Sequence, residues 1–391
     1  MDPEIRKGVA VIYLDHAATA YPRHPGVAEA MLQALEVAGS VGRGGHAGAR
    51  AAGDLVGDCR GRLADLLGAV DDQRISLFPS STLALSTLIT DLLGKAEGDS
   101  HLYMGVLEHN AVWRPAVRIG GEDRVRFLPS DDDGRVMTEK LEEIDASKVL
   151  GVVLQHASNV TGILQPLEEV GAWCQQHGIP FIVDGAQAAG LVPFSVSRCP
   201  GLKAYTMAGH KHLGGPPGIG PCWMAPGYEP EPLWIGGNGI DSALPKVPES
   251  GPGRFESGTP NLPGIAGLAK ALEFFDDHAV SDRFSAGHAQ RQKWVEALQS
   301  IPGVEIPGEM GTAPRTPVIP LHLPGKAPEE VAAQLDARLG VRCRSGLQCA
   351  PLAHQHLGTL EAGGTLRIAP GEETGADVID PVCRALAELA S

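Results

Sequence analysis

Cysteine is scarce in this sequence: the 391 residues include seven cysteines, and no two of them are spaced as Cys-x-x-Cys. So sparse a set excludes a disulfide scaffold of the kind found in small secreted domains. Because the count is odd, at least one thiol is expected to be free. A reducing compartment, the cytoplasm, fits this composition best.

Positive charge is also in deficit, since 32 Lys and Arg residues face 47 Asp and Glu residues and the formal net charge is −15. A field of this sign repels nucleic-acid backbones and anionic membranes, so neither is expected as a partner. No apolar run reaches the roughly 18 residues of a membrane-spanning helix. The apolar stretch near the N-terminus is interrupted by Asp15 and His16, too early for a signal peptide. We therefore predict a soluble protein.

Hydrophobic residues make up 43% of the chain, enough for a large core and roughly two domains. From about residue 70 to residue 225, apolar runs typical of strands alternate with stretches of helical periodicity. This alternation predicts an α/β fold with a mostly parallel sheet between helices. The predicted strands are 74–78, 101–106, 149–154 and 179–183, and the predicted helices are 83–93, 110–119, 167–177 and a short one at 184–190.

Residues 209–258 are rich in glycine and proline and predict a set of ordered loops rather than a periodic element. Helical periodicity returns at 265–275 and 289–298, and we place a domain boundary near Pro263. The predicted organisation is an N-terminal arm (1–15), a large domain (16–263) and a smaller C-terminal α+β domain (264–391). The small domain is expected to contain strands near 317–323 and 365–368 and a terminal helix at 378–389.

Ligands in such a sheet bind beyond the carboxyl ends of the strands, where this sequence places polar and small residues. Lys211 follows one strand among small residues, a poorly solvated setting that lowers the pKa of an amine and suits it to form a Schiff base. Asp184 ends another strand, where a carboxylate can keep a pyridine nitrogen protonated. Alone, Lys211 would more simply be a surface residue and Asp184 a helix cap. Together they indicate a cofactor site.

Ser80, Ser81 and Thr82 lie between a strand and the start of a helix, where hydroxyls, free N–H groups and the positive end of the helix meet. This arrangement predicts a phosphate site, although an ordinary N-cap is the commoner role of Ser or Thr at that place. His109 follows another strand and is placed to lay its ring on a planar cofactor. Taken alone, it would be a polar loop residue.

Eight segments, read together and in this order, resemble the motifs of class V pyridoxal-phosphate enzymes, over residues 13 to about 370. The last segment is similar to that of group II cysteine desulfurases and selenocysteine lyases. The resemblance implies fold type I, with a mostly parallel seven-stranded sheet, and pyridoxal 5′-phosphate as the cofactor. The segments are YLDHAATA (13–20), RGGH (43–46), EHNA (108–111), SNVTG (158–162), VDGAQAAG (183–190), AGHKHLGGPPGIG (208–220), FESGTPN (255–261) and RSGLQCAPLAH (344–354).

The resemblance also implies roles for single residues. Lys211 would bond covalently to the cofactor, Asp184 would pair with its pyridine nitrogen and Gln187 would contact its ring oxygen. Thr259 would reach the phosphate bound by a second subunit, which makes a homodimer the expected form. His109 would stack on the ring and act in catalysis, Ser81, Thr82 and His210 would hold the phosphate, Asn159 would contact cofactor and substrate, and Arg344 and Arg367 would bind the substrate.

Cys349 decides between the chemistries of this class. Removing sulfur from cysteine requires a thiolate that attacks the sulfur of the substrate, leaving a persulfide on the enzyme and releasing alanine. An aminotransferase needs no such group. A free cysteine is often only a small buried hydrophobe, but Cys349 stands in a polar loop that contains Gly346. The other cysteines are expected to be structural: Cys59, Cys174, Cys199, Cys222, Cys343 and Cys383.

The sequence therefore predicts a cysteine desulfurase that acts on L-cysteine and passes sulfur to an acceptor protein, as in iron–sulfur cluster assembly. Three other functions stay open: a selenocysteine lyase, another class V enzyme such as an aminotransferase or epimerase, and a non-catalytic scaffold for sulfur trafficking. Three residues depart from the family pattern. Ala208 replaces a usual serine donor to the phosphate, Gln348 replaces a histidine that often precedes the cysteine, and His16 replaces an asparagine.

Motifs for other functions are weak. No G-x-G-x-x-G opens a helix after a strand, and no G-x-x-x-x-G-K-[ST] occurs. The His-Gln-His segment at 354–356 offers two imidazoles without a third metal ligand, so it is interpreted as a loop and no metal is expected. The Asp-Asp-Asp-Gly run at 131–134 is interpreted as a solvated turn.

Overall fold

The computed structural model describes residues 11–37, 39–41, 44–239, 243 and 245–391 of the chain. Within these residues the main sheet contains seven strands in the order β2-β8-β7-β6-β5-β3-β4. The five strands from β7 to β4 are parallel, whereas β8 runs antiparallel to both of its neighbours. The strands are β2 (Ile75–Phe78), β3 (His101–Met104), β4 (Val125–Phe127), β5 (Val149–Gln155), β6 (Phe181–Asp184), β7 (Leu202–Thr206) and β8 (Gly220–Met224).

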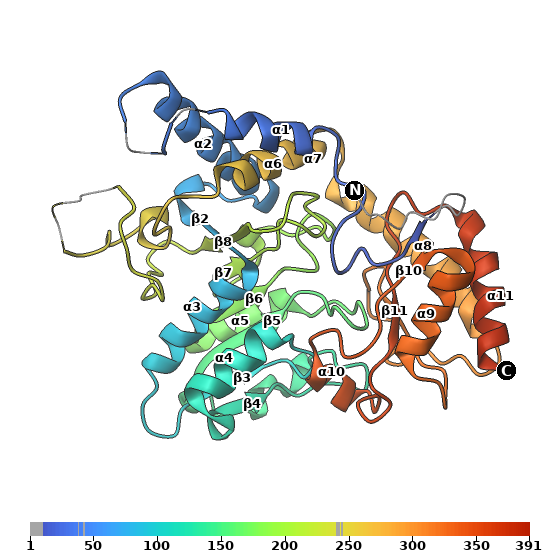
Figure 1. Cartoon of the computed structure of the whole chain (residues 1–391). Helices are drawn as coiled ribbons and strands as arrows, with labels where there is room; N and C mark the ends of the chain where they lie inside the picture. Colours follow the sequence, from blue (N-terminus) through green and yellow to red (C-terminus); the bar gives the residue numbers. More distant parts are fainter. Residues whose placement is uncertain (1–10, 38, 42–43, 240–242, 244) are drawn as a thin grey trace.

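Helices cover both faces of this sheet (Figure 1). On one face, Val153 and Ile182 pack in a core with α3 (Ser81–Gly94) and α4 (Asn110–Gly120). On the other face, Val152 and Val183 pack in a core with α2 (Ala47–Leu67) and α5 (Leu167–His177). Because the central strands β5 and β6 are buried on both faces, their sequences are mostly continuous apolar runs, as the sequence predicted. Among the described residues, no helix combines the length and apolar character needed to span a bilayer.

The helix α6 (Leu262–Leu272) packs against α1 (Val27–Leu35) and α2, and its Ile265 and Leu268 belong to the core of the main sheet. The boundary placed at Pro263 falls in the first turn of this helix. The short α7 (Phe274–Asp277) follows, and α8 (Val280–Gln299) places Trp294 and Leu298 in a separate core. We therefore propose that the large domain extends through α6 and that the small domain begins near α8.

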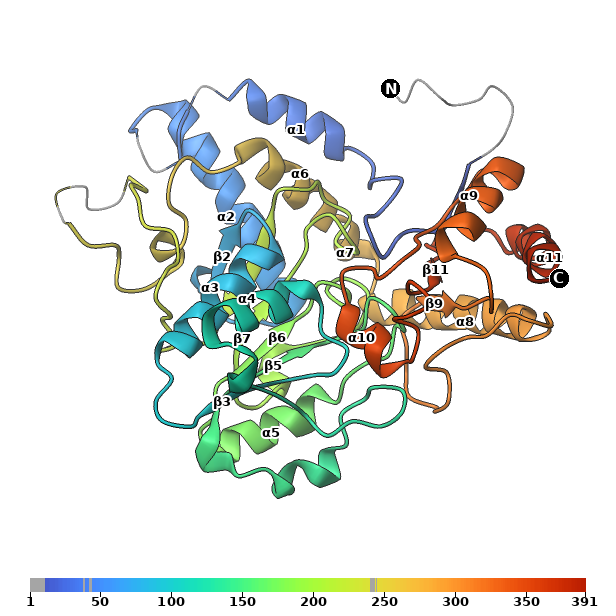
Figure 2. The same cartoon turned by 60° about the horizontal axis from the view of Figure 1, so that its bottom comes forward.

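The C-terminal core is built from α8, α9 (Pro328–Leu339) and α11 (Ile379–Ala390) around the antiparallel pair β9 (Ile319–Leu321) and β11 (Leu366–Ile368). The predicted strands and terminal helix of this part are thus confirmed. β1 (Ile12–Tyr13) pairs in parallel with β10 (Val341–Arg342), and Leu14 lies in the same core. Residues 11–15, the part of the predicted arm that the structure describes, therefore pack on the C-terminal unit (Figure 2).

Three local predictions are wrong. The short helix expected at 184–190 is a turn, because its N–H groups return to the Gly185 carbonyl instead of continuing a helix. The glycine-rich region 209–258 contains β8, which pairs with β2 although glycine and proline begin its sequence. The His-Gln-His segment lies on a helix rather than in a loop, since it ends α10 (Pro351–His356).

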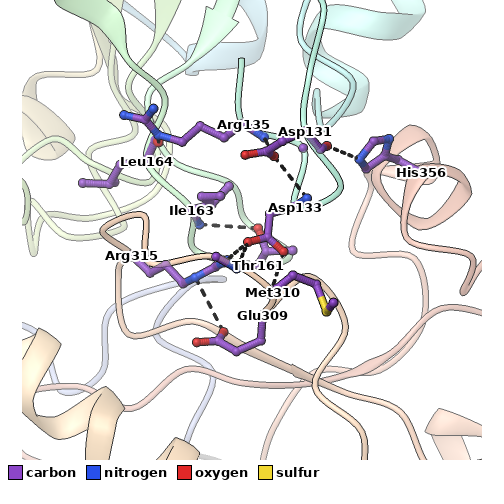
Figure 3. A network of polar contacts seen from close by, with 12 residues as sticks. Asp131, Asp133, Arg135, Thr161, Ile163, Leu164, Glu309, Met310, Arg315 and His356 are labelled. Atoms are coloured by element: carbon purple, nitrogen blue, oxygen red, sulfur yellow. Dashed lines mark hydrogen bonds and ion pairs between the residues drawn. The ribbon is translucent and has the colours of Figure 1, made fainter. Parts of the chain in front are cut away.

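The acidic run at 131–134 is only partly a solvated turn. Asp131 and Asp132 are exposed, but Asp133 is 3% exposed and its carboxylate accepts hydrogen bonds from the N–H groups of Met310 and Gly311. The same carboxylate lies 2.7 Å from the buried guanidinium of Arg315 (Figure 3). The prediction missed Asp133 because its partners are about 180 residues away in the chain.

Candidate active site

A cavity of about 280 Å³ opens beyond the carboxyl ends of β5, β6 and β7. This is the edge of the sheet at which the sequence predicted a ligand site. The cavity brings together most of the predicted site residues, which come from five separate segments of the chain. Its lining includes Ser81, Thr82, His109, Asn159, Asp184, Gln187, His210 and Lys211.

The first turn of α3 forms one end of the cavity. Ser80 is the N-cap, and its side chain accepts a hydrogen bond from the Leu83 N–H, so the capping interpretation is right for this residue. Ser81 and Thr82 follow in the first turn and also line the cavity, and the Ser81 hydroxyl donates to Thr206. The first N–H groups of a helix and its positive dipole end favour an anion at this place.

Gly220, at the start of β8, lets the backbone of β8 approach this helix start closely. A Cβ atom at Gly220 would lie 2.1 Å from the Ser80 carbonyl carbon and 2.2 Å from the Ser81 nitrogen. Both are backbone atoms and cannot turn aside, so any larger residue would push β8 away from α3. The glycine therefore fixes the position of the anion site relative to the sheet.

Lys211 reaches the cavity from the turn after β7, where the Lys211 N–H bonds to the Ala208 carbonyl. Burial lowers the pKa of its amine to about 8, although the nearby Asp184 carboxylate acts in the opposite direction. Asp184 itself ends β6, is buried, and accepts a hydrogen bond from the Ala186 N–H at 2.9 Å. A buried amine with a lowered pKa and a buried carboxylate thus share one small cavity.

His109 is the N-cap of α4, and its Nδ1 atom accepts a hydrogen bond from the Ala111 N–H at 3.0 Å. The proton of the neutral ring is therefore on Nε2. Burial lowers the pKa of His109 to about 4, with Asp184 opposing and Lys211 adding to the shift. The ring is uncharged at neutral pH, which suits stacking on a flat ligand.

The segment from Asp15 to Ala20 packs against the turn that carries Lys211 and holds two of the side chains predicted to bind the cofactor. His210 shares a hydrogen bond between its Nδ1 atom and the Thr19 hydroxyl, and burial lowers the pKa of His210 to about 4. Gln187 donates from Nε2 to the Ala17 carbonyl, and its buried Oε1 atom has no partner in the described structure. The YLDHAATA segment (13–20) therefore supports two side chains of the cavity wall.

Asn159 lies in the cavity wall, and Arg367 packs behind it. Arg367 donates to the Asn159 carbonyl at 3.0 Å and to the Asp15 carboxylate at 2.7 Å, so its guanidinium is held from two sides. Its Nε atom and the Oδ1 atom of Asn159 are buried without a partner among the described residues. Asn159 lines the cavity, whereas Arg367 lies directly behind it.

Cys349 is exposed and sits on a loop held by residues of the cavity. Its carbonyl accepts a hydrogen bond from the Asn110 N–H at 2.7 Å, and the Gln348 carbonyl accepts one from the Asn159 amide at 2.7 Å. Cys349 and Gln348 have φ angles of 57° and 42°, which non-glycine residues adopt at a cost. Strain of this kind persists only where surrounding contacts hold the backbone in place.

Cys349 also lines a second, more open cavity of about 400 Å³. Thr82, His109 and Ala111 line both cavities, so the exposed sulfur stands beside the entrance of the lysine cavity. The remaining cysteines are buried or half-buried, and burial raises the pKa of each of these thiols. Among the described residues, Cys349 is thus the accessible thiol.

A family model described as Aminotransferase class-V matches residues 12–377. The chain belongs to the class V aminotransferase family. It is 30% identical over 387 residues to a probable cysteine desulfurase of Pyrococcus abyssi, covering 93% of this chain and 91% of that protein. It is 28% identical over 364 residues to a probable cysteine desulfurase of Halalkalibacterium halodurans, covering 90% and 86% of the two chains.

Solved structures of cysteine desulfurases share the fold. The apo cysteine desulfurase of Thermococcus onnurineus NA1 matches with a TM-score of 0.86 at 26% identity, over 97% of this chain and 94% of that chain. The cysteine desulfurase CsdA of Escherichia coli, with an S-sulfonic acid, matches with a TM-score of 0.84 at 26% identity and the same coverage. The predicted fold type I architecture is therefore confirmed.

Membership of the class V family implies pyridoxal phosphate, and the residues of this cavity fit that cofactor. The first turn of α3 suits the phosphate, and the buried Asp184 carboxylate suits a protonated pyridine nitrogen. The lowered pKa of Lys211 makes part of its amine neutral and able to bond an aldehyde. The partnerless Oδ1 of Asn159 and Oε1 of Gln187 are further polar atoms in the wall that a ligand can satisfy.

Besides Arg367, which lies behind the wall, two predicted residues of this class V site line neither cavity. Arg344 is exposed on the segment that bridges to Arg367, and its side chain is absent from the lining of both cavities. Thr259 is exposed and also absent from both linings. Its predicted role concerns a second subunit and stays a prediction. Arg43, the first residue of the RGGH segment, is outside the described residues, and His46 is the N-cap of α2.

The three departures from the family pattern have distinct surroundings. Ala208 lines the cavity without a hydroxyl, so a hydrogen bond of a usual serine is missing there. The Gln348 amide donates to the Thr365 carbonyl and shares a hydrogen bond with His354 Nε2 at 2.9 Å. Burial lowers the pKa of His354 to about 4, so this imidazole is neutral too. His16 is buried and packs against Gly371, where a Cβ would meet its ring.

Two further buried residues, for which the sequence predicted no role, lie in the cavity wall or directly behind it. Gln155 ends β5, lines the cavity and donates from its side chain to the Leu107 carbonyl at 2.9 Å. Glu108 is fully buried and accepts a hydrogen bond from the Gln155 N–H at 2.8 Å, and burial raises its pKa. Glu108 stands in the EHNA segment, but nothing in the sequence indicated that its side chain turns inward to support the neighbouring strand.

Proposed function

We propose that this class V enzyme is a cysteine desulfurase that converts L-cysteine to L-alanine and keeps the sulfur as a persulfide on Cys349. The observation that carries the proposal is the position of Cys349. It is an exposed thiol on a loop tied to Asn110 and Asn159, beside the entrance of the cavity that contains Lys211. A thiol at this place has a use in sulfur removal and none in transamination.

Bound pyridoxal phosphate supplies an electron sink that stabilises negative charge at the α-carbon of an amino acid. We assign Lys211 to hold the cofactor and to move the proton at the substrate α-carbon. A pKa of about 8 leaves its amine able to accept and return a proton near neutral pH. Asp184 would hold a proton on the pyridine nitrogen of the bound cofactor, and the neutral ring of His109 would offer its flat face to that cofactor.

Cys349 takes the sulfur in the proposed reaction. Its thiolate forms a bond to the substrate sulfur, the bond between that sulfur and the substrate β-carbon breaks, and the three-carbon product leaves as alanine after protonation. We assign Arg367 to the substrate carboxylate, because its buried Nε–H has no acceptor among the described residues. We assign Asn159 to a donor group of the substrate or cofactor, because its buried Oδ1 atom is an acceptor without a partner among the described residues. The exposed Arg344 is proposed to assist from the adjoining segment.

The proposal also covers the subgroup of the enzyme, its oligomeric state and the acceptor of its sulfur. We place the chain with group II desulfurases because of the segment around Cys349, a placement that the likeness to Escherichia coli CsdA supports. We propose a homodimer in which Thr259, exposed on its own chain, contacts the cofactor phosphate of the second subunit. The persulfide sulfur would serve an acceptor, as iron–sulfur cluster assembly requires.

The test is the production of alanine from L-cysteine by enzyme loaded with pyridoxal phosphate. We expect Cys349→Ala to lower the rate of alanine formation by roughly a hundredfold or more, since the group that breaks the carbon–sulfur bond is lost. Cys383→Ala, which removes a half-buried thiol on α11, is the matched control and should keep the wild-type rate. Wild-type rates in Cys349→Ala, or a keto acid as product, would contradict the proposal.

A further inference from the structure

The cavity beside Cys349 carries positive charge in a strongly acidic protein. Its lining includes Arg114 and Arg118 of α4 and the hydroxyl-bearing residues Thr82 and Ser86 of α3, and it contains no Asp or Glu. Both arginines are exposed, and neither forms an ion pair or hydrogen bond with another described residue. The chain has a net charge of −15, yet the two guanidiniums lie around one exposed thiol with no carboxylate in the lining.

The spacing of the two arginines argues against a purely structural role. They are four residues apart on one helix, so they lie on the same face, where like charges repel. Arg118 is in the last turn of α4 and gains from the negative end of the helix dipole, but Arg114 lies in the middle and does not. The field of Arg114 reaches the active site, because it contributes to the lowered pKa of His109.

We propose that this arginine-lined cavity binds the sulfur acceptor, and that the acceptor is a small thiol carrying more than one carboxylate. The inference rests on the proposed function, because it needs a persulfide on Cys349. A cavity of about 400 Å³ has the size of a site for a small molecule. Two guanidiniums one helical turn apart match two carboxylates on one molecule, and Cys349 in the same cavity places the sulfur beside its thiol.

The transfer balances without an oxidant or a reductant. The acceptor thiolate bonds to the outer sulfur of the Cys349 persulfide, and the bond between that sulfur and Cys349 Sγ breaks. Cys349 leaves as a thiolate, and the acceptor carries away the outer sulfur with its proton as a new persulfide. One thiolate is consumed and one is formed, so the enzyme is ready for another substrate.

The experiment separates loading of sulfur from its release. Holoenzyme is first treated with L-cysteine, and mass spectrometry of the Cys349 peptide measures the persulfide formed. After removal of cysteine, the loaded enzyme is mixed with mercaptosuccinate, which has two carboxylates, or with neutral 2-mercaptoethanol. The rate of persulfide loss is divided by the concentration of thiolate. It is then divided by the rate at which the same thiolate attacks a small-molecule disulfide in solution, which corrects for its intrinsic nucleophilicity.

We expect mercaptosuccinate to react about tenfold faster than 2-mercaptoethanol at low ionic strength, with the advantage shrinking as salt screens the arginines. The double variant Arg114→Gln/Arg118→Gln should bring the ratio of the two rates close to one. Arg384→Gln removes the same type of charge from an exposed position on α11 and should keep the wild-type ratio. This control separates a local effect from a change in net charge.

Every other outcome overturns the acceptor proposal, and one of them overturns the proposed function as well. If Cys349 gains no persulfide from L-cysteine, the proposed function fails, and the acceptor proposal fails with it. If the persulfide forms but the two thiols react at equal rates in the wild type, only the acceptor proposal fails. The acceptor proposal also fails if the arginine double variant keeps the preference for mercaptosuccinate, or if Arg384→Gln loses it to the same extent.

Discussion

Burial lowers the pKa of three basic groups in the cavity: Lys211 to about 8, and His109 and His210 each to about 4. The two imidazoles are therefore neutral at pH 7 and contribute donors and acceptors rather than charge. The amine of Lys211 is neutral in roughly a tenth of the molecules at pH 7, against fewer than one in a thousand for an ordinary lysine. This fraction makes Lys211 far more reactive toward an aldehyde than an ordinary lysine.

The lowered pKa of Lys211 predicts a pH profile that does not depend on catalysis. Only the neutral amine is nucleophilic, so labelling of Lys211 by trinitrobenzenesulfonate in cofactor-free protein should rise with pH and reach its midpoint near pH 8. Peptide mass spectrometry measures the labelling, and exposed Lys326 in the same digest gives the reference profile. A midpoint near pH 10.5, the value of an unperturbed lysine, would contradict the burial of this amine.

Single residues of the site could be predicted where the side chain has distinctive chemistry and its position follows from the nearby sequence. Lys211 and Asp184 each follow a strand, so their meeting at one sheet edge follows from the parallel topology. The amide contacts of Gln348 were not predictable, because Thr365 and His354 reach it only after the chain has folded back. The same holds for Glu108, whose inward orientation depends on β5.

At the scale of elements, the anion site depends on how closely β8 approaches the start of α3. The contact is made by backbone alone, since the absent Cβ of Gly220 leaves room for Ser80 and Ser81. The sequence did not reveal this contact, because glycine and proline in 209–220 favour loops over strands. Pairing of β8 with β2 overrides that local preference, and the side chains of Cys222 and Met224 are buried as a result.

This close approach predicts a specific effect of Gly220→Ala. The new methyl group would meet backbone atoms at about 2.1–2.2 Å, so we expect a loss of about 1–3 kcal/mol in the free energy of unfolding. The affinity for pyridoxal phosphate should fall as well, because α3 must shift. Chemical denaturation and titration with the cofactor measure the two effects.

The matched control for Gly220→Ala is Gly57→Ala. Gly57 lies within α2, and a Cβ there has open space around it. This change should stabilise the protein by up to about 1 kcal/mol through helix propensity and leave cofactor affinity unchanged. If the two variants behaved alike, the close contact between β8 and α3 would not be what positions the anion site.

At the scale of the whole molecule, a buried ionic network joins the large domain to the C-terminal part of the chain. Asp133 bonds to Arg315 and to the Met310 N–H, and Arg315 also pairs with Glu309 at 3.6 Å (Figure 3). Glu309 in turn pairs with Arg291 of α8 at 2.9 Å. Close by, the Thr316 N–H bonds to the Gly162 carbonyl at 2.8 Å, next to the segment that carries Asn159. The network thus fixes the cavity wall to the second domain.

Removal of one partner from this network should be costly, because the other charge stays buried. Asp133→Ala takes the nearer carboxylate from Arg315, which is 2% exposed and, among the described residues, keeps only Glu309 at 3.6 Å. It also leaves the N–H groups of Met310 and Gly311 without their acceptor, so we expect a loss of about 3 kcal/mol in the free energy of unfolding. Asp132→Ala removes an exposed carboxylate from the same turn and should change stability by less than about 0.5 kcal/mol. Urea denaturation followed by circular dichroism compares the two variants. Equal stabilities would show that Asp133 behaves as a solvated turn residue, as its sequence alone had indicated.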